Sequence, residues 1–271
     1  EYTRRAGSLE AGLQLYSDDV TLGANTTLTS TGSGAITFSG TLGNAASRTL
    51  AVNTGGTTTF GGTVGAGTML TSVTTDAAGT TAINGGSVAT TGVQTYEDNV
   101  TLGTNAAITA STVTFNGTVN GGTTSSLGVT GNAVFGDAGA DSVTGLTTLA
   151  VSGTTGINTN VITTATTQTY SGAVTLAAAG TPTLTGAGIT FSNTVNGAAA
   201  LTVNDSATTT FANTVGAGTM LTSVTTDAAG TTAINGGVVS TSGIQTYGDA
   251  VTLGTNAAIT ASTVTFNGTV N

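Results

Sequence analysis

The sequence contains no histidine, cysteine or tryptophan, and its three basic residues are the arginines Arg4, Arg5 and Arg48. Histidine, cysteine and lysine are the side chains that most often activate a nucleophile or carry a proton near neutral pH. Serine and threonine hydroxyls are abundant, but no such base accompanies them. We therefore expect no enzymatic activity, no catalytic residues and no cofactor.

Positive charge is scarce, and the formal net charge is -9. Lysine and arginine neutralise phosphates in nucleic-acid complexes, so we expect no nucleic-acid partner, and anionic membranes are disfavoured for the same reason. The sequence has no apolar run of membrane-spanning length and no signal peptide. We therefore expect that this chain does not insert into a membrane. Any targeting segment was removed or lies outside this sequence. The lack of cysteine is compatible with bacterial surface proteins that avoid disulfides.

Aromatic residues are few, yet they follow one pattern. All seven phenylalanines and four of the five tyrosines occupy one position of a repeated unit, and Tyr2 alone stands outside it. Isoleucine takes the aromatic position once in every four repeats. We predict that these positions form a structural stacking ladder, because aromatic rings on neighbouring coils can stack with an offset. The predicted ladder consists of Tyr16, Phe38, Phe60, Ile83, Tyr96, Phe115, Phe135, Ile157, Tyr170, Phe191, Phe211, Ile234, Tyr247 and Phe266.

The spacing of the ladder positions predicts a repeat protein with short coils. The intervals average about 19 residues, which indicates about 14 coils, and the order Tyr-Phe-Phe-Ile defines four-coil super-repeats of about 77 residues. We expect a non-repeat leader at residues 1–6 and a β-solenoid over residues 7–271. The intervals that follow isoleucine, such as Ile83 to Tyr96, are clearly shorter than the others. Either the isoleucine lies on a neighbouring corner or every fourth coil has a shortened side.

The segments around the ladder positions alternate apolar residues with threonine, the period-two pattern of β-strands. Examples are residues 35–38, 112–115 and 100–102. Glycine, asparagine and aspartate lie between these segments, where sharp corners require positive φ angles. We predict an all-β chain that folds as a single elongated parallel β-helix, in which every coil depends on its neighbours for stability.

Two groups of acidic residues are candidate site residues. Asp18-Asp19 and Glu97-Asp98 follow tyrosines of the ladder, and paired carboxylates can act as acid and base. The third copy has no acid after Tyr170, and the fourth keeps only Asp249, so we interpret these residues as solvated corner residues.

Asp76 and Asp227 lie in identical Thr-Thr-Asp-Ala-Ala-Gly segments, and their carboxylates are candidate calcium ligands. They lie at an offset of 151 in the sequence and cannot share an ion in a solenoid. The glycine-rich calcium-binding nonapeptide of other β-rolls does not occur. We therefore expect no metal site.

Residues 63–120 match residues 214–271 at a constant offset of 151, with six differences. Repeats of the form Gln-x-Tyr-x-x-x-Val-Thr-Leu, Val-Thr-Phe and Thr-Thr-Ala-Ile-Asn-Gly-Gly resemble the β-strand repeats of large bacterial exoproteins of the filamentous haemagglutinin and autotransporter-adhesin type. The resemblance covers residues 7–271. It implies a right-handed, three-sided parallel β-helix that is exported and displayed at the bacterial cell surface or secreted.

The function that follows is structural: the stalk, shaft or filament of an adhesin-like fibre. The expected partners are other copies, which associate end to end, or neighbouring repeats of a longer chain, together with a carbohydrate or protein of a host or matrix. An alternative is a carbohydrate- or ice-binding face, suggested by the Thr-Thr-Thr runs at residues 57–59 and 208–210. A more remote alternative is a polysaccharide-degrading β-helix enzyme that uses Asp18 or Asp98.

Overall fold

A computed structural model describes residues 8–10, 12–177 and 181–271 of the chain. The predicted leader at residues 1–6 lies outside this part. The described residues are all β, with no helix, and form two compact units, residues 1–132 and 133–271. In both units the strands pair in parallel with strands one coil before and one coil after, so the predicted parallel β-helix is confirmed.

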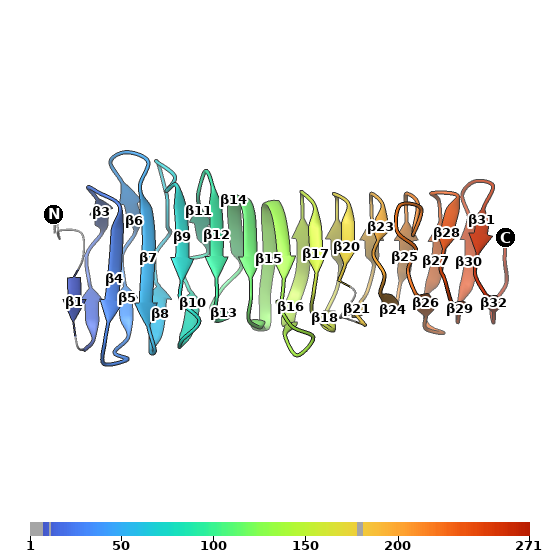
Figure 1. The fold of residues 1–271 in the computed structure, drawn as a ribbon, viewed down its shortest axis with the longest axis horizontal. Helices are drawn as coiled ribbons and strands as arrows, with labels where there is room; N and C mark the ends of the chain where they lie inside the picture. Colours follow the sequence, from blue (N-terminus) through green and yellow to red (C-terminus); the bar gives the residue numbers. More distant parts are fainter. Residues whose placement is uncertain (1–7, 11, 178–180) are drawn as a thin grey trace. The chain divides into compact units, whose positions relative to one another are not determined.

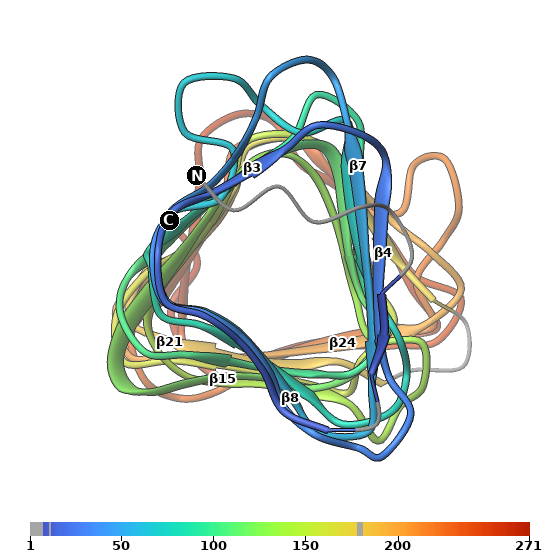
Figure 2. The same cartoon turned by 90° about the vertical axis from the view of Figure 1, so that its left-hand side faces the viewer.

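The first unit winds around three sides, which we name after one strand each (Figure 2). The β7 side contains β1 (Ser8–Glu10), β4 (Thr26–Ser30), β7 (Thr49–Thr54), β9 (Ser72–Thr75), β12 (Val93–Tyr96) and the end of β14 (Ala106–Phe115). The β8 side contains β2 (Gln14–Tyr16), β5 (Ile36–Phe38), β8 (Thr57–Phe60), β10 (Thr80–Ile83), β13 (Asn99–Leu102) and the start of β15 (Val119–Phe135). The β6 side contains β3 (Val20–Leu22), β6 (Leu42–Asn44), β11 (Ser87–Ala89) and the start of β14.

The pairings of the second unit also define three sides, and most of its strands are labelled in Figure 1. The β24 side contains the start of β16 (Ser142–Val151), β18 (Val161–Thr164), β21 (Thr183–Gly186), β24 (Ala200–Asp205), β26 (Ser223–Thr226), β29 (Ile244–Tyr247) and β32 (Thr263–Phe266). The β25 side contains the end of β16, β19 (Gln168–Tyr170), β22 (Ile189–Phe191), β25 (Thr208–Phe211), β27 (Thr231–Ile234) and β30 (Ala250–Leu253). The β28 side contains the end of β15, β17 (Thr155–Ile157), β20 (Val174–Leu176), β23 (Val195–Asn196), β28 (Val238–Ser240) and β31 (Ala258–Thr260).

The handedness of the coil can be followed in the first unit. Seen from its amino-terminal side, the chain runs clockwise from β3 to β4, and from β7 to β8, as it moves away from the viewer (Figure 2). The coil is therefore right-handed, the hand that parallel crossover connections almost always take.

The alternation of side chains places the core inside each coil. Strands such as β8 and β27 have every second residue buried, and the buried set includes the ladder residues Phe60 and Ile234. Threonines fill most of the alternate, outward positions. This is the pattern that period-two sequences predict.

The coils are longer and fewer than the spacing suggested. One turn reaches from Thr26 to its register partner Leu50, whereas a shorter turn reaches from Tyr96 to its partner Phe115. The fold has about 12 turns in place of the 14 that we expected. The cause lies in the short intervals after isoleucine, because each covers two of the three sides and not a whole turn.

Isoleucine stays in the column of the preceding phenylalanine, since Phe60 pairs with Ile83 and Ile83 with Leu102. Tyr96 instead pairs with Thr75, on the β7 side. The turn from Ile83 to Leu102 is shorter than the turn from Phe60 to Ile83, but at the short interval the residue that moves to another side is the tyrosine and not the isoleucine. From one tyrosine to the next, the super-repeat therefore covers three turns and two further sides, not four coils.

Glycine and asparagine have different tasks at the corners. Thirteen glycines of the described part of the chain have positive φ; at Gly79, for example, an added Cβ would lie 2.0 Å from the Gly56 carbonyl oxygen of the preceding coil. Among the described residues other than glycine, Ser33 alone has positive φ, so the positive φ that we expected for asparagine and aspartate is wrong. Their side chains instead accept amide hydrogen bonds from the next coil, as Asn99 does from Thr118 at 2.9 Å and Asn105 from Ser126 at 2.9 Å.

Candidate functional site

The predicted ladder forms separate stacks and not one column. In the first unit, Tyr16, Phe38, Phe60 and Ile83 share the β8 side, whereas Tyr96 and Phe115 share the β7 side. In the second unit, Phe135 and Ile157 lie on the β28 side, Tyr170, Phe191, Phe211 and Ile234 on the β25 side, and Tyr247 and Phe266 on the β24 side. The stack therefore changes side after each isoleucine.

Within each stack the rings are nearly parallel and offset. Ring centroids are 5.0 Å apart for Tyr16 and Phe38, 5.8 Å for Phe38 and Phe60, and 5.3 Å for Tyr96 and Phe115. The second unit has the same geometry, with 5.3 Å for both pairs of the Tyr170 stack and 5.1 Å for Tyr247 and Phe266. These distances lie in the favourable range for offset stacking, so the stacks stabilise neighbouring coils against each other.

Each tyrosine that begins a stack donates a hydrogen bond to a glutamine two residues earlier. The four pairs are Gln14–Tyr16, Gln94–Tyr96, Gln168–Tyr170 and Gln245–Tyr247, at 3.1, 2.9, 2.9 and 2.9 Å. We did not predict this role from the sequence, although a polar residue two positions before an inward tyrosine must also point inward.

The glutamine amide nitrogen completes the cluster by donating to backbone carbonyls. Gln94 Nε2 lies 3.1 Å from the Val88 oxygen in its own coil and 3.0 Å from the Thr109 oxygen in the next coil. Gln245 repeats both bonds with Val239 and Thr260. Burial raises the pKa of Tyr96, Tyr170 and Tyr247 far above the ordinary value, so each phenol stays protonated and serves as a donor.

The carboxylates that follow two of these tyrosines point into the coil. Asp98 is 4% exposed and accepts hydrogen bonds from the hydroxyls of Thr75 and Thr81, both at 2.9 Å. Asp249 is 5% exposed and accepts the equivalent bonds from Thr226 at 3.0 Å and Thr232 at 2.9 Å. Our interpretation of these two residues as solvated is wrong, because the inward alternation that starts at the tyrosine continues around the corner.

The surroundings of Asp98 shift the pKa of its carboxyl group. Burial raises the pKa of Asp98 above 3.8, the two threonine hydroxyls lower it in part, and the charge of Asp76 raises it further. Both threonine donors belong to the preceding coil, so Asp98 joins two coils.

Of the other predicted acidic residues, Asp18 and Asp19 lie at the surface and Glu97 is half-buried. Asp18 and Asp19 are exposed, and Asp19 accepts a hydrogen bond from the Thr41 amide at 2.7 Å, which lowers its pKa. Glu97 accepts a hydrogen bond from Asn116 Nδ2. Asp18 and Asp98, the two alternatives named for a hydrolase, therefore lie in different environments, one exposed and one buried.

The two residues considered for calcium bind backbone amides. Asp76 Oδ1 accepts a hydrogen bond from the Thr54 amide at 2.9 Å, and Asp227 Oδ1 from the Asp205 amide at 3.1 Å. In the described part of the chain, no group of three or more His, Cys, Asp or Glu side chains could hold a metal ion.

Asp205, which the sequence analysis did not single out, is the acidic residue with the most hydrogen-bond donors around it. Its carboxylate accepts bonds from the amides of Gly188 and Ile189 at 2.7 Å, from the Ala207 amide at 2.9 Å and from the Thr209 hydroxyl at 3.2 Å. Its inward position follows from Val203, two residues earlier on β24. Such a set of donors stabilises a corner and leaves the carboxylate with no lone pair directed at a ligand.

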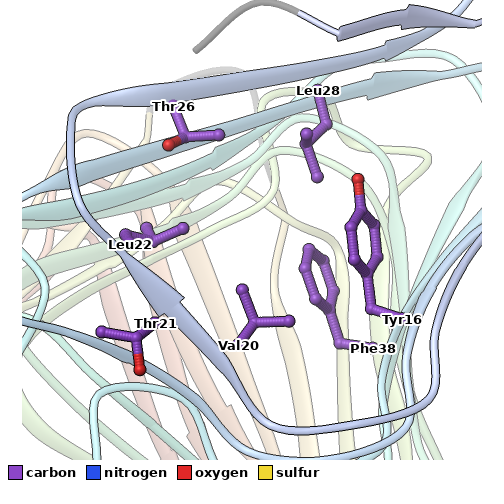
Figure 3. Close-up of a pocket in the computed structure, with 7 residues that line it drawn as sticks. All are labelled: Tyr16, Val20, Thr21, Leu22, Thr26, Leu28 and Phe38. Atoms are coloured by element: carbon purple, nitrogen blue, oxygen red, sulfur yellow. The ribbon is translucent and has the colours of Figure 1, made fainter. Parts of the chain in front are cut away.

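One small pocket, partly open to solvent, lies among the first coils (Figure 3). The stacked rings of Tyr16 and Phe38 form one wall, and Val20 and Leu28 point toward them. The complete lining consists of Tyr16, Val20, Thr21, Leu22, Thr26, Leu28 and Phe38. None of these residues is charged, so the pocket offers neither an acid nor a base.

The structure has no helix that could cross a lipid bilayer within the residues it describes. No protein-family model, no curated protein and no solved structure matches the chain.

Proposed function

We propose that this chain is a structural repeat segment, the stalk, shaft or filament of a bacterial adhesin-like fibre that is secreted or displayed at the cell surface. The observation that carries the proposal is the pairing of every side with the same side one coil before and after. A construction of this kind can be lengthened by whole coils without redesign, because each coil contacts only its neighbours.

The use of the polar residues supports the same proposal. Asp98, Asp249 and Asp205 all join one coil to another, as do the buried glutamines. A catalytic site would instead need polar groups that converge on a substrate. Stacked rings and these hydrogen bonds resist the separation of coils, which is what a stalk or spacing element requires.

The register provides a direct test of a length-setting role. Tyr96 and Phe115 are register partners, so residues 97–115 make up one whole turn. Inserting further copies of residues 97–115 should lengthen the particle by about 4.8 Å per copy, the spacing of neighbouring strands, as measured by electron microscopy or small-angle scattering.

A matched control is the insertion of residues 84–96, which reach from after Ile83 to the next ladder position but cover two sides only. That insertion should disrupt register and lower the parallel β-sheet signal in circular dichroism. If both insertions lengthened the particle equally well, or neither folded, the proposal would be wrong.

The partner that we propose first is another copy of the chain or a neighbouring repeat, since parallel coils pair through backbone groups that every coil presents. Sedimentation velocity over a range of concentrations should detect end-to-end association. A single monomeric species at high concentration would contradict it. Binding to host or matrix carbohydrate or protein can be tested on glycan and matrix-protein arrays.

A second candidate function is a carbohydrate- or ice-binding face, and one observation favours it. On the β24 side, five successive coils place threonine at the same outward register position: Thr183, Thr202, Thr225, Thr246 and Thr265. In the corresponding column of the first unit, Ala51 interrupts the run. Thermal hysteresis or a glycan signal that is lost in Thr225→Val and unchanged in Thr74→Val would support this function. No signal in either assay would exclude it.

A further inference from the structure

The two copies of the segment Phe-Asn-Gly-Thr-Val differ in what contacts the asparagine. Asn116 and Asn267 are equivalent at the offset of 151, and glycine follows both. The Asn116 side-chain amide donates a hydrogen bond to the Glu97 carboxylate of the preceding coil. Gly248 occupies the position of Glu97 in the second copy, so this acceptor is missing there.

Asn267 is exposed, and within the described part of the chain neither its side chain nor the Gly268 amide has a hydrogen-bond partner. An asparagine before glycine is chemically susceptible, because glycine has no Cβ to hinder the approach of its backbone nitrogen to the asparagine side chain. A carboxamide that can rotate and an amide that is not engaged are the two local requirements for this attack.

The other Asn-Gly sites each lack one of these requirements. The amides of Gly85 and Gly236 donate to the Phe60 and Phe211 oxygens, at 2.9 and 3.1 Å. The Gly197 amide donates to the Thr219 oxygen at 3.2 Å. Asn120 lies within β15 and its Oδ1 accepts a hydrogen bond from the Gly122 amide at 2.8 Å.

We propose that Asn267-Gly268 is a site of spontaneous deamidation and that Glu97 protects the equivalent Asn116. The Gly268 nitrogen loses its proton and forms a bond to Cγ of Asn267, the Cγ–Nδ2 bond breaks, and ammonia leaves. Water then opens the cyclic imide at either carbonyl, which yields aspartate or isoaspartate. No oxidant, reductant or further reactant is required.

The modification has a structural consequence around Asn267. Both products add a negative charge one coil after Gly248 and Asp249, in a chain whose formal net charge is already -9. Isoaspartate also adds a carbon to the backbone between residues 267 and 268, which displaces Val270 from its register partner Val251.

The test is incubation of the purified chain in mildly alkaline buffer, followed by peptide mass spectrometry that distinguishes the two copies. We expect acid to accumulate at Asn267 several-fold faster than at Asn116 in the same molecules. Glu97→Gly, the residue that the other copy carries, should raise the rate at Asn116 to that of Asn267. Glu97→Gln, whose side-chain oxygen still accepts a hydrogen bond, should keep Asn116 protected.

Circular dichroism establishes that each variant is folded. Equal rates at the two asparagines in the unaltered chain would overturn the proposal, and this comparison does not depend on any variant. A folded Glu97→Gly variant in which Asn116 remains stable would overturn the protective role of Glu97.

Discussion

Residues 63–120 of the first unit and 214–271 of the second are nearly identical in sequence, yet the same side chains differ in burial. Phe115 is 0% exposed and its equivalent Phe266 is 37% exposed, while Val119 is 0% and Val270 44% exposed. The residues and their register with the preceding coil are the same. The comparison teaches that the same residue in the same register with the preceding coil can be fully buried or partly exposed, so the preceding coil alone does not determine the burial of a ladder residue.

A second difference between the two units lies at the corner before β8 and β25. Thr54 in the first unit and Asp205 in the second are equivalent, and the backbone amide of each donates to an aspartate of the next coil. Thr54 supplies one hydroxyl, which donates to the Gly34 oxygen and accepts from the Gly56 amide. Asp205 supplies a carboxylate with four donors around it. The same corner is thus stabilised by a neutral hydroxyl in one unit and by a carboxylate in the other.

The largest expected effect concerns the burial of the ladder. Phe115→Ala removes a fully buried ring and should lower the free energy of unfolding by about 3–5 kcal/mol, because both the transfer of the ring and the cavity contribute. Phe266→Ala should cost clearly less, since part of that ring already contacts water. Urea unfolding followed by circular dichroism measures both. Equal losses of unfolding free energy would show that the difference in burial between the two rings does not affect stability.

The next effect concerns the carboxylate at the corner. Asp205→Ala leaves the amides of half-buried Gly188 and buried Ile189 without acceptors and should lower the free energy of unfolding by about 2–4 kcal/mol, from the desolvation of unsatisfied donors. Thr54→Ala should cost about 1 kcal/mol, because one hydroxyl is lost. Asp205→Thr introduces the residue that the first unit has at this position, and its loss of unfolding free energy should lie between the other two. A Thr54→Ala loss as large as that of Asp205→Ala would contradict the ionic contribution.

Much of this fold could be predicted from the residues because two simple periods determine it. Alternation along a strand places Phe38, Phe60 and Phe211 inside, and the repeat places one coil over the next. What the sequence spacing could not reveal is how many sides an interval covers. The short interval between Ile83 and Tyr96 is compatible with a shortened coil or with two sides of an ordinary one, and hydrogen-bond register alone distinguishes the two.

The inward direction of these polar residues could be predicted from their spacing, but the differences among the copies favoured a position at the surface. Gln94 and Asp98 are each two residues from Tyr96 and therefore share its inward direction. We predicted that Asp98 is solvated because the third copy has no acid after its tyrosine and the fourth keeps only Asp249. The threonines that compensate its burial, Thr75 and Thr81, belong to another coil, so nothing in the local sequence marks them as partners.

A smaller effect concerns the glutamine–tyrosine pairs. Tyr96→Phe removes the donor to the buried Gln94 side-chain oxygen and should lower the free energy of unfolding by about 1–2 kcal/mol. Tyr247→Phe, in the second copy, should cost about the same, because the hydrogen bond has the same length of 2.9 Å. Tyr16→Phe should cost less, since Tyr16 is half-buried and its bond to Gln14 is 3.1 Å long. The order of the three urea midpoints checks this, and a largest loss at Tyr16 would contradict it.

The smallest effect that we predict is a pH dependence with opposite signs at two aspartates of the first unit. Burial raises the pKa of Asp98 above 3.8 in the folded state, so its contribution to stability is fully present below pH 3.8 and is lost as the pH rises through the folded pKa. The Thr41 amide lowers the pKa of Asp19, so its contribution is present above pH 3.8 and is lost as the pH falls through the folded pKa. Urea midpoints measured against pH should therefore fall less steeply with rising pH in Asp98→Asn than in the unaltered chain, and more steeply in Asp19→Asn. The same slope in both variants would contradict the difference between the inward and the surface carboxylate. A carboxylate that water reaches freely has no burial to raise its pKa above the value in the unfolded chain, so only a buried Asp98 can produce the opposite sign.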